Sequence, residues 1–546
     1  MYASPFNLLA PELIVGIAGC VVLVLGAGKE SMRRILPWIS LAALVLAIIF
    51  VKFLNPAAAD AMSDGDPQWM TIGGLDYQYR SVDGGWGPLL GPLADFVRIS
   101  ALIFGVLILI VNWATPRLEE AGEFFSMMLF MICGLMMMGA ANDLIVLFMA
   151  IELVSVPSYI IVALSRSNSR ALESATKYFY LGAFAAALTA YGMSFLYGAT
   201  GTTSLGPEAM ERLRQALTGV APGGALAYGV AMVGVTLTIT GLLFKLAAFP
   251  LHFYVADVYE GAASGVAGML GFVPKLAGLM AITKVLALTG WLTLSHPGLF
   301  YTLWVVAAFS AIVGNVLAFL QTNVKRMLAY SGVAHAGYMV VGLMAGAGKQ
   351  GAVFGDGPGA VLYYVMIYGI ANLGAFAILG LLRRRGQACE TVQDLAGLLK
   401  RSPGIALLMA LAMFTLMGMP PTPGFWGKFW LFGGALSAAS EAAEPFRSWY
   451  IALVIISVVT AAIGAAYYLR VIAACLLAES DEPADLAPRE SLYMGAVLCG
   501  FLIIVFMLVP KTLLSAGSDA SRGVMRPEVA HVEKPENAAQ LASDLE

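Results

Sequence analysis

The sequence predicts an all-α polytopic membrane protein. Of its 546 residues, 60% are hydrophobic and only 12% are charged, and the mean hydropathy is +0.82. A soluble globular protein has about 45–50% apolar and about 25% charged residues, so this composition favours a lipid environment. Apolar runs of about 20 residues, the length that crosses a bilayer as a helix, recur along the chain. Alternating segments of about ten residues, typical of a membrane β-barrel, are absent from the sequence.

The lengths of the apolar runs, and the breakers between them, predict about fourteen transmembrane helices. No basic segment or cleavage site accompanies the first run, so we expect a retained span rather than a signal peptide. Two runs, 226–256 and 404–434, are longer than one crossing requires; the first contains Pro250 and the second has three prolines within 420–423. Proline removes a backbone hydrogen bond, which predicts that both helices are broken. The expected spans are 9–28, 35–54, 92–113, 124–141, 143–164, 172–198, 226–256, 265–290, 299–320, 325–345, 358–382, 404–434, 449–475 and 491–512.

Lys and Arg are distributed unevenly between the expected loops. Basic residues accumulate in cytoplasmic loops, so the richer set of loops, those after odd-numbered spans, is expected in the cytoplasm, with both termini outside. The loop at 55–88, acidic and rich in Gly and Pro, fits the outer side, and the tail at 516–546 is polar. The fourteen residues in odd loops are Lys29, Arg33, Arg34, Arg117, Arg166, Arg170, Lys325, Arg326, Arg383, Arg384, Arg385, Lys400, Arg401 and Arg489. The five in even loops are Arg80, Arg212, Arg214, Lys349 and Arg447.

Four lysines and one glutamate lie inside the apolar runs. An ionised side chain at the bilayer centre costs roughly 2.5–3.5 kcal/mol, and one anion cannot neutralise four cations. Desolvated lysines titrate as low as about pH 5–6 and desolvated glutamates as high as about pH 8–9, so such groups exchange protons near neutral pH. A carboxylate beside a lysine holds it charged, and moving the carboxylate away releases a proton. The pattern therefore indicates a proton relay. The five residues are Glu152, Lys177, Lys245, Lys275 and Lys428.

Structural roles compete with this interpretation. Lys177 lies near the start of its span, where a long side chain reaches the interface, so both interpretations stay open for it. Lys284 and Arg98 are further candidates for such snorkelling and are left out of the site. The other four charged residues lie too far from a span end to snorkel easily, which favours function. For His252 and His335, a relay role and a buried, hydrogen-bonded role both remain open.

The two broken spans carry their lysines in mirror-image order. Lys245 precedes Pro250, whereas Lys428 follows the prolines at 420–423. A break frees backbone groups that hydrocarbon cannot satisfy, so breaks persist only beside polar side chains or water. Mirror-image order, five spans apart, is what two inverted repeats would produce. We therefore expect the interrupted helix at Lys245 to be a hydrated lysine site at membrane depth.

Motifs for cofactors are absent from the sequence. The five cysteines lie far apart, mostly in apolar runs and without a CxxC pair, so we expect no metal or iron–sulfur ligation. No Walker or GxGxxG loop follows a predicted strand, so nothing indicates nucleotide binding. We accordingly expect no cofactor in this chain and no nucleic-acid partner.

Several segments resemble the antiporter-like subunits of respiratory complex I, and most closely subunit N of bacterial NADH–quinone oxidoreductase. They extend from the first expected span to the twelfth, with spacing typical of the family. The block QTNVKRMLAYSGVAHAGY is highly specific for the superfamily, more so than the Glu and Lys positions alone. The matching segments are NLLAPELIVGI, LFMAIELVSVPSYIIVAL, RALESATKYFYLGA, GLLFKLAAFPLHFYVADVYEGA, VPKLAGL, VGNVLAFLQTNVKRMLAYSGVAHAGYMVVGL and LMGMPPTPGFWGKF.

The resemblance implies a fold of fourteen helices. It implies two inverted five-helix repeats, at about 124–290 and about 299–475, within one proton-translocating transmembrane domain at 1–515. Each repeat would contain a broken helix, near 245–255 and near 418–428.

The resemblance also implies roles for the buried charges. Glu152 would pair with Lys245 in the first half-channel, Lys275 would be the central proton carrier, and Lys428 would be the lysine of the second half-channel. Two further positions, matched to a lysine of the N subunit and to a polar residue beside the break, are Lys177 and His252.

The implied function is proton translocation by a membrane-arm subunit of NADH–quinone oxidoreductase in the bacterial inner membrane. Electron transfer from NADH to quinone would drive it from partner subunits, so the chain would belong to a translocating enzyme and hold no redox centre. NADH, FMN, iron–sulfur clusters and quinone would be bound by other subunits. Its partners would be other antiporter-like and small helical membrane-arm subunits, together with the lipid bilayer.

The sequence departs from the family pattern at one place. The family usually has prolines in a PD-Y-GAP stretch, whereas VADVYEGAAS has Ala256 and Ala263 there, so we expect a less rigid backbone. Two long outer loops, at 55–90 and 200–225, are unexplained. A glutamate at the position of Lys428 is typical of subunit M, and a long lateral helix after the last span is typical of subunit L. Neither is present, which favours subunit N.

Two alternatives remain open. One is an Mrp-type cation/proton antiporter subunit, or the antiporter-like subunit of a membrane-bound hydrogenase, because these share much of the same core. The other is a membrane scaffold that transports nothing. A scaffold explains the shape but not four lysines and a glutamate at membrane depth.

Overall fold

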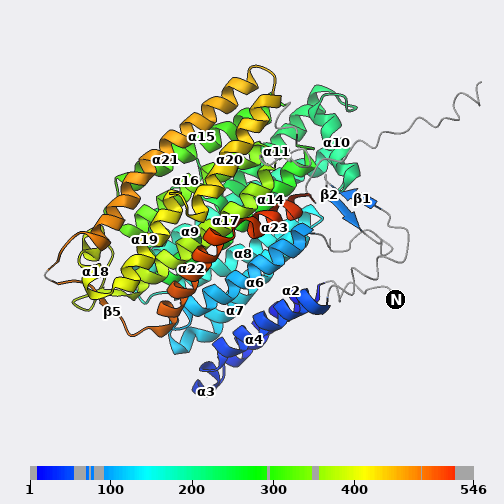
Figure 1. Cartoon of the computed structure of the whole chain (residues 1–546). Helices are drawn as coiled ribbons and strands as arrows, with labels where there is room; N and C mark the ends of the chain where they lie inside the picture. The colour runs from blue at the N-terminus through cyan, green and yellow to red at the C-terminus, as the bar shows by residue number, and fades with distance from the viewer. Residues whose placement is uncertain are drawn as a thin grey trace, which may run out of the picture.

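The chain folds into a bundle of long helices, as the composition predicts (Figure 1). Twelve helices in the described part are long and apolar enough to cross a membrane. The other two expected spans fall on α2 (Ala10–Gly26), which has 17 residues, and on the interrupted pair α19 (Pro403–Met417) and α20 (Pro423–Glu441). The all-α membrane class is confirmed, and the number fourteen stays a prediction. The computed structural model describes residues 9–54, 69–72, 75–78, 92–291, 296–346, 356–480 and 482–522.

The first helices lie at one end of the bundle. α2 and α4 pack against each other and against α6 and α7, and they form the dark blue edge in Figure 1. A short antiparallel hairpin lies within the loop expected at 55–88, whose other residues fall outside the described part. The elements here are α2, α3 (Glu30–Arg33), α4 (Leu36–Ile49), the π-turn η1 (Phe50–Leu54), β1 (Trp69–Ile72), β2 (Leu75–Gln78) and α6 (Pro92–Asn112).

Two successive sets of five helices follow, with the same order of contacts. In each set the first helix packs on the second, the second on the third, the third on a broken helix, the broken helix on the fifth, and the fifth on the first. This is the contact order that two repeats of one unit would produce. The first set is α7 (Ala121–Ala140), α8 (Leu144–Leu164), α9 (Ser169–Thr200), α11–α12 (Ala225–Leu246, Val255–Gly261) and α13–α14 (Ser264–Leu270, Val273–Leu288). The second is α15 (Pro297–Phe319), α16 (Val324–Met344), α17 (Gly357–Leu381), α19–α20 and α21 (Phe446–Leu476).

Both expected breaks are present. α11 ends at Leu246, where Ala247 takes a left-handed conformation with φ 56°, and helix resumes only at α12. α19 ends before Gly418, whose φ of +80° suits glycine, and helix resumes at α20. A third interruption, at Gly271 and Phe272 between α13 and α14, was not predicted. The nearby Gly271 and Pro274 are the signal that would have indicated it.

Alanine takes a distinct role where the family has proline. Ala256 lies within α12, and Ala263 precedes α13 as its N-cap. The backbone N–H of Ala263 donates to the Ser165 hydroxyl at 3.2 Å, a hydrogen bond that proline cannot make. The alanine therefore ties the start of α13 to the end of α8.

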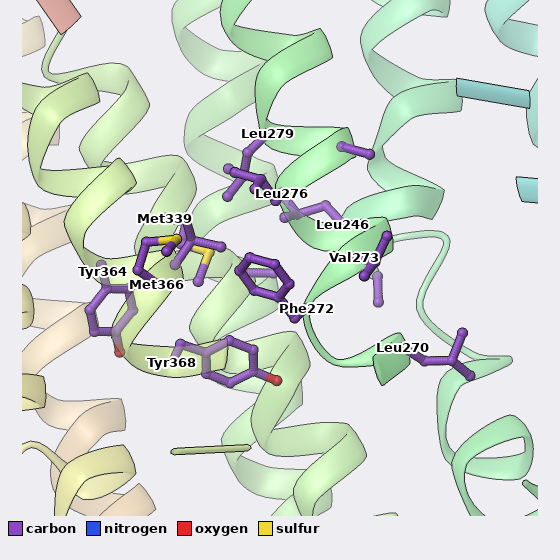
Figure 2. Packing of buried hydrophobic residues seen from close by; sticks show 14 of the residues in the cluster. Leu246, Leu270, Phe272, Val273, Leu276, Leu279, Met339, Tyr364, Met366 and Tyr368 are labelled. Carbon is purple, nitrogen blue, oxygen red and sulfur yellow. The ribbon is translucent and has the colours of Figure 1, made fainter. Parts of the chain in front are cut away.

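The centre of the bundle consists of α14, α16 and α17. In the described bundle, 94–100% of the apolar 18-residue stretch of each of these helices is buried, compared with 33% for the peripheral α9. Figure 2 shows Phe272, which precedes α14, and Leu276 of α14 on the side of Met339 of α16 and Tyr368 of α17. The three central helices are shielded from lipid by the others, so polar groups on them are isolated from both water and lipid.

The connecting loops meet in two separate groups. On one face, loops after odd-numbered expected spans bind one another: Arg326 pairs with Asp257 and Glu260 at 2.8 Å, and Arg166 lies 3.6 Å from Glu390. Near this face lie η2 (Leu118–Glu120), β3 (Leu382–Arg384), β4 (Gln387–Ala388), η4 (Val392–Leu395), α18 (Leu398–Arg401) and β5 (Asp485–Leu486), with strand order β4-β3-β5. The described loops after even-numbered spans meet elsewhere, as in the bridge between residues 143 and 204. The chain therefore alternates between two faces, and the basic loops share one of them.

Two amphipathic helices account for residues that the sequence left unexplained. α10 (Pro207–Leu217), in the loop at 200–225, packs on α9, α11 and α14, and Arg212 binds the carbonyl of Thr200 at 2.8 Å. α22 (Glu490–Leu508) is followed by α23 (Pro510–Arg522), which packs on α17 and α6. The Ser521 hydroxyl donates to Asp356, the N-cap of α17, at 2.5 Å. The first residues of the polar tail are thus helical, and residues 523–546 lie outside the described part.

Accessibility labelling tests the orientation. In a background without the native cysteines, Gln387→Cys lies on the face of basic loops and Val220→Cys on the other face, and both positions are exposed. The basic-loop asymmetry predicts that a membrane-impermeant maleimide labels the first only from the cytoplasm and the second only from outside. The reverse pattern would overturn the orientation.

Candidate functional site

Lys245 is buried at the end of α11 and bound by a tyrosine. Its side chain is 4% exposed, and its Nζ donates to the Tyr159 hydroxyl at 3.0 Å. The ammonium also lies 5.5 Å from the Tyr159 ring centre and 5.3 Å from that of Phe244. Aromatic faces and a hydroxyl therefore surround this cation where a carboxylate was expected.

The expected pairing of Glu152 with Lys245 stays a prediction. No ion pair within 4 Å joins these two described residues, and one carboxylate oxygen of Glu152 is buried without a hydrogen-bond partner in the described part. Glu152 and Tyr159 are both on α8, seven residues or about 10 Å apart along the helix. Tyr159 rather than Glu152 therefore reaches Lys245, and the charge of Glu152 acts on Lys245 electrostatically without contact.

Lys275 binds the carbonyl that the first break releases. The side chain is 1% exposed at the start of α14, and its Nζ donates to the carbonyl of Leu246 at 2.6 Å and of Gly332 at 3.0 Å. Leu246 is the last residue of α11, where carbonyls lose their intrahelical partners. The lysine of one helix thus satisfies the broken end of another.

Lys428 has the corresponding arrangement at the second break. It is 8% exposed, and its Nζ donates to the carbonyls of Leu416 and Met417, at 3.1 and 2.8 Å, at the end of α19. A Cβ on Gly418 would lie 2.9 Å from the lysine Cδ, so glycine leaves room for this approach. The ammonium lies 5.4 Å from the Tyr338 ring centre. Lys275 and Lys428 thus bind backbone carbonyls at the ends of α11 and α19, and the expected hydration of Lys245 stays a prediction.

A row of polar groups on α16 extends between these two lysines. Gly332, His335 and Tyr338 follow at three-residue spacing, so they share one face of the helix. Gly332 binds Lys275 through its carbonyl, and Tyr338 lies under Lys428.

His335, in the middle of this row, has a partner on each ring nitrogen. The hydroxyls of Tyr364 and Tyr468 lie 2.6 and 2.8 Å from Nδ1 and Nε2. The hydroxyl of Tyr338 in turn accepts from Asn315 at 2.8 Å. The sequence left the role of His335 open. The i, i+3 spacing within LAYSGVAHAGY was a signal for Tyr338, but Tyr364 and Tyr468 come from other helices and gave no local signal.

A small cavity lies between Lys245 and Lys275. Its volume of about 10 Å³ is about enough for one water molecule. Its lining includes both lysines together with Tyr178, Tyr254 and Tyr259. Water between the first two lysines therefore has room and polar partners.

Lys177 and His252 lie away from this row. Lys177 is 45% exposed and pairs with Glu173 at 2.7 Å and with Asp257 of α12 at 3.0 Å. His252 lies in the first break, its ring 5.8 Å from that of Phe249, and its Nδ1 is buried without a hydrogen-bond partner in the described part. The structure brings neither side chain into hydrogen-bond contact with a buried lysine.

Three charged residues expected elsewhere are buried. Lys284, set aside as a snorkelling side chain, is 3% exposed and donates to the carbonyls of Gly139 and Ala141 at the end of α7. Lys325, counted among loop charges, is 1% exposed and binds the carbonyl of Ala262 after α12 at 3.1 Å. Positive charge is stabilised at helix C-termini, which explains these placements.

Arg98 is likewise buried, where snorkelling had been considered. Its side chain is 0% exposed, and its Nε donates to Glu12 of α2 at 2.6 Å. The pair joins α6 to α2 and so fixes the first helix to the bundle. Within the described residues, no group of three or more His, Cys, Asp or Glu side chains forms a candidate metal site.

Comparison with known proteins identifies the family. Residues 141–466 match the transmembrane family described as NADH:quinone oxidoreductase/Mrp antiporter. NADH-quinone oxidoreductase subunit N of Trichlorobacter lovleyi is 35% identical, over 83% of this chain and 89% of the relative. The same subunit of Rhodospirillum rubrum is 32% identical, over 94% and 96%. The chain belongs to the family of NADH–quinone oxidoreductase subunit N. All six site residues that the sequence predicted lie inside the matched residues.

Solved structures agree with this family. A chain of respiratory complex I from Thermus thermophilus with bound aureothin has a TM-score of 0.70 and 26% identity, over 93% of this chain and 99% of that chain. A chain of the Mrp complex from Dietzia sp. DQ12-45-1b has a TM-score of 0.75 but 18% identity, over 95% and 98%. The Mrp likeness shows a common fold alone. The curated relatives therefore favour subunit N over the Mrp alternative.

Proposed function

We propose that this chain translocates protons as an antiporter-like membrane-arm subunit of complex I, next to other antiporter-like and membrane-arm subunits. The observation that carries the proposal is the set of buried polar groups formed by Lys245, Lys275, His335 and Lys428. Ammonium groups without a carboxylate partner at this depth are expensive, and structural capping alone explains neither the histidine nor its two tyrosines. In a bacterium, the chain would lie in the inner membrane with both termini outside.

The chemistry of the row suits proton transfer. Lysine amines release and accept protons, and imidazole and phenol groups both donate and accept hydrogen bonds. Backbone carbonyls accept hydrogen bonds but take no proton, so at both breaks they hold the charged form of the lysine. A proton reaching Lys275 from Lys245 would pass through the cavity between them, and one leaving Lys275 would pass His335 toward Lys428 or in the opposite direction.

Coupling requires that a distant event change the protonation of this row. Electron transfer from NADH through FMN and iron–sulfur clusters to quinone would occur in partner subunits and reach this chain as a shift of charge. Glu152 is suited to receive such a shift, because its carboxylate acts on Lys245 without being bound to it. The chain would thus contribute translocation, and its partners the redox chemistry, to one oxidoreductase.

Substitutions at Glu152 test the proposal. An opposite charge close to a lysine shifts the equilibrium between its two protonation states by about tenfold or more, since one pKa unit is a factor of ten. Glu152→Gln removes this charge, so proton pumping by the intact complex should fall by about tenfold, measured in vesicles with a pH-sensitive dye. Glu152→Asp keeps the charge and should retain a large part of the rate. If both variants pump equally and at nearly the wild-type rate, Glu152 takes no part in proton translocation.

A further inference from the structure

α8 carries a row of oxygen-bearing side chains that leads to Lys245. Glu152, Ser155 and Tyr159 are spaced i, i+3 and i+7, so they lie along one face of the helix. Ser155 and Tyr159 are 1% and 6% exposed, and the Ser155 hydroxyl donates to the carbonyl of Ile151 at 2.6 Å. The row ends at the hydrogen bond from Lys245 to Tyr159.

Lys245 differs from the other buried lysines in its acceptor. Lys275 and Lys428 each bind two backbone carbonyls, whereas Tyr159 is the hydrogen-bond acceptor of Lys245 within the described residues. A carbonyl can only accept, so it loses its hold on an amine whose lone pair faces it. A hydroxyl accepts from an ammonium and donates to a neutral amine. Tyr159 therefore has a hydrogen bond to offer Lys245 in both protonation states.

The surroundings hold Tyr159 in this position. A Cβ on Gly182 of α9 would lie 2.0 Å from the Tyr159 hydroxyl oxygen, so glycine at 182 makes the space that the hydroxyl occupies. The ring packs edge-on against Tyr178, with centres 4.6 Å apart. The Tyr159 hydroxyl thus has a fixed place beside Lys245. The lysine side chain is long and flexible and would not hold its amine in one position by itself.

We propose that Tyr159 is a positioning residue for Lys245, which keeps the amine in place through protonation and deprotonation. This inference rests on the proposed function and deepens it, since it names the partner through which one relay group is held. The titratable groups facing Lys245 from the helices around it are Glu152, Tyr159, Tyr178, Tyr254, Tyr259 and Lys275.

Tyr159→Phe tests the proposal through the pH profile of pumping. The ring and its packing are kept, but Lys245 loses its hydrogen bond in both protonation states. The bond to the ammonium is charge-assisted and therefore the stronger one, so the neutral amine becomes more favourable. Pumping by the intact complex needs the proton that Lys245 carries at rest. The pH at which pumping is lost on the alkaline side should therefore fall by about one unit. Tyr450→Phe is the matched control: Tyr450 is buried and donates to the carbonyl of Met344 at 2.7 Å, away from any lysine. Its pH profile should be that of the wild type.

Gly182→Ala provides an independent variant. It keeps the Tyr159 hydroxyl but displaces it, and alanine is favourable within a helix. The loss of pumping on the alkaline side should therefore again move to lower pH. An unshifted profile in both Tyr159→Phe and Gly182→Ala would overturn the proposal. So would loss of the assembled complex in Tyr159→Phe with a normal complex in Tyr450→Phe, because that would make the role structural.

Lys245→Met separates failure of this inference from failure of the proposed function. If Lys245→Met abolishes pumping and Tyr159→Phe pumps with the wild-type profile, the relay stands and Tyr159 has no positioning role. If Lys245→Met itself pumps normally, the proposed relay is wrong as well.

Discussion

Lys275→Ala should leave complex I assembled and lower its proton pumping by at least about tenfold, because it removes a proton-transfer group. The substitution removes the amine between the first break and α16, so a proton arriving from Lys245 has no group to receive it. The carbonyls of Leu246 and Gly332 also lose their donor, which costs on the order of 1–3 kcal/mol. A bundle held by extensive apolar packing around α14 should tolerate that loss.

The measurement compares three quantities in membranes: the amount of complex on a native gel, its quinone reductase rate and its pumping rate. Wild-type pumping by Lys275→Ala would remove Lys275 from the relay. Failure to isolate any complex would instead support the scaffold interpretation, in which the lysine only closes the broken helix.

Lys428→Met should have an effect of similar size in the second half of the row. Methionine has nearly the length of lysine but neither charge nor donor, so the packing against Tyr338 is kept while the link to Leu416 and Met417 is lost. Pumping should fall by at least about tenfold, with the complex still present.

Lys400→Met is the matched control for this substitution. Lys400 is 72% exposed and pairs with Glu479, and a surface pair of this kind contributes about 0–1 kcal/mol. The control should pump as the wild type does. If Lys428→Met is equally unaffected, the second lysine does not carry protons.

The breaks and the buried charges were predictable because each has a signature of its own. Proline inside an apolar run that is longer than one membrane crossing indicates a broken helix. A lysine inside an apolar run is recognisable from the sequence because charged residues are rare there. Lys245, Lys275 and Lys428 therefore emerged from the sequence, and the structure places all three in the interior.

The partners of these charges were not predictable in the same way. Lys275, Lys428 and Lys284 bind backbone carbonyls, which every residue has, so no residue type reveals the acceptor. Charge alone suggested Glu152 as the partner of Lys245 and gave no sign of Tyr159, which lies two turns farther along α8 and accepts the hydrogen bond from the lysine. Spacing along α8, read together with charge, would have pointed to that tyrosine.

Burial of the loop-end charges was missed for a physical reason as well. Lys284 and Arg98 lie near span ends, where a side chain in lipid reaches water, but both face other helices rather than lipid. Whether a side chain near a span end faces lipid or another helix depends on tertiary packing, which the sequence of a single span does not reveal.

The central claim is that Lys275 serves by gaining and losing a proton, and Lys275→Arg tests it most directly. Arginine keeps the positive charge and the donors for the two carbonyls, but it does not lose its proton at any pH that proteins experience. The measurement is the number of protons translocated per NADH oxidised by the complex in sealed proteoliposomes. The relay predicts a lower ratio than in the wild type with the complex intact. A wild-type ratio would show that charge and capping suffice at this position, and that the proposed relay through Lys275 is wrong.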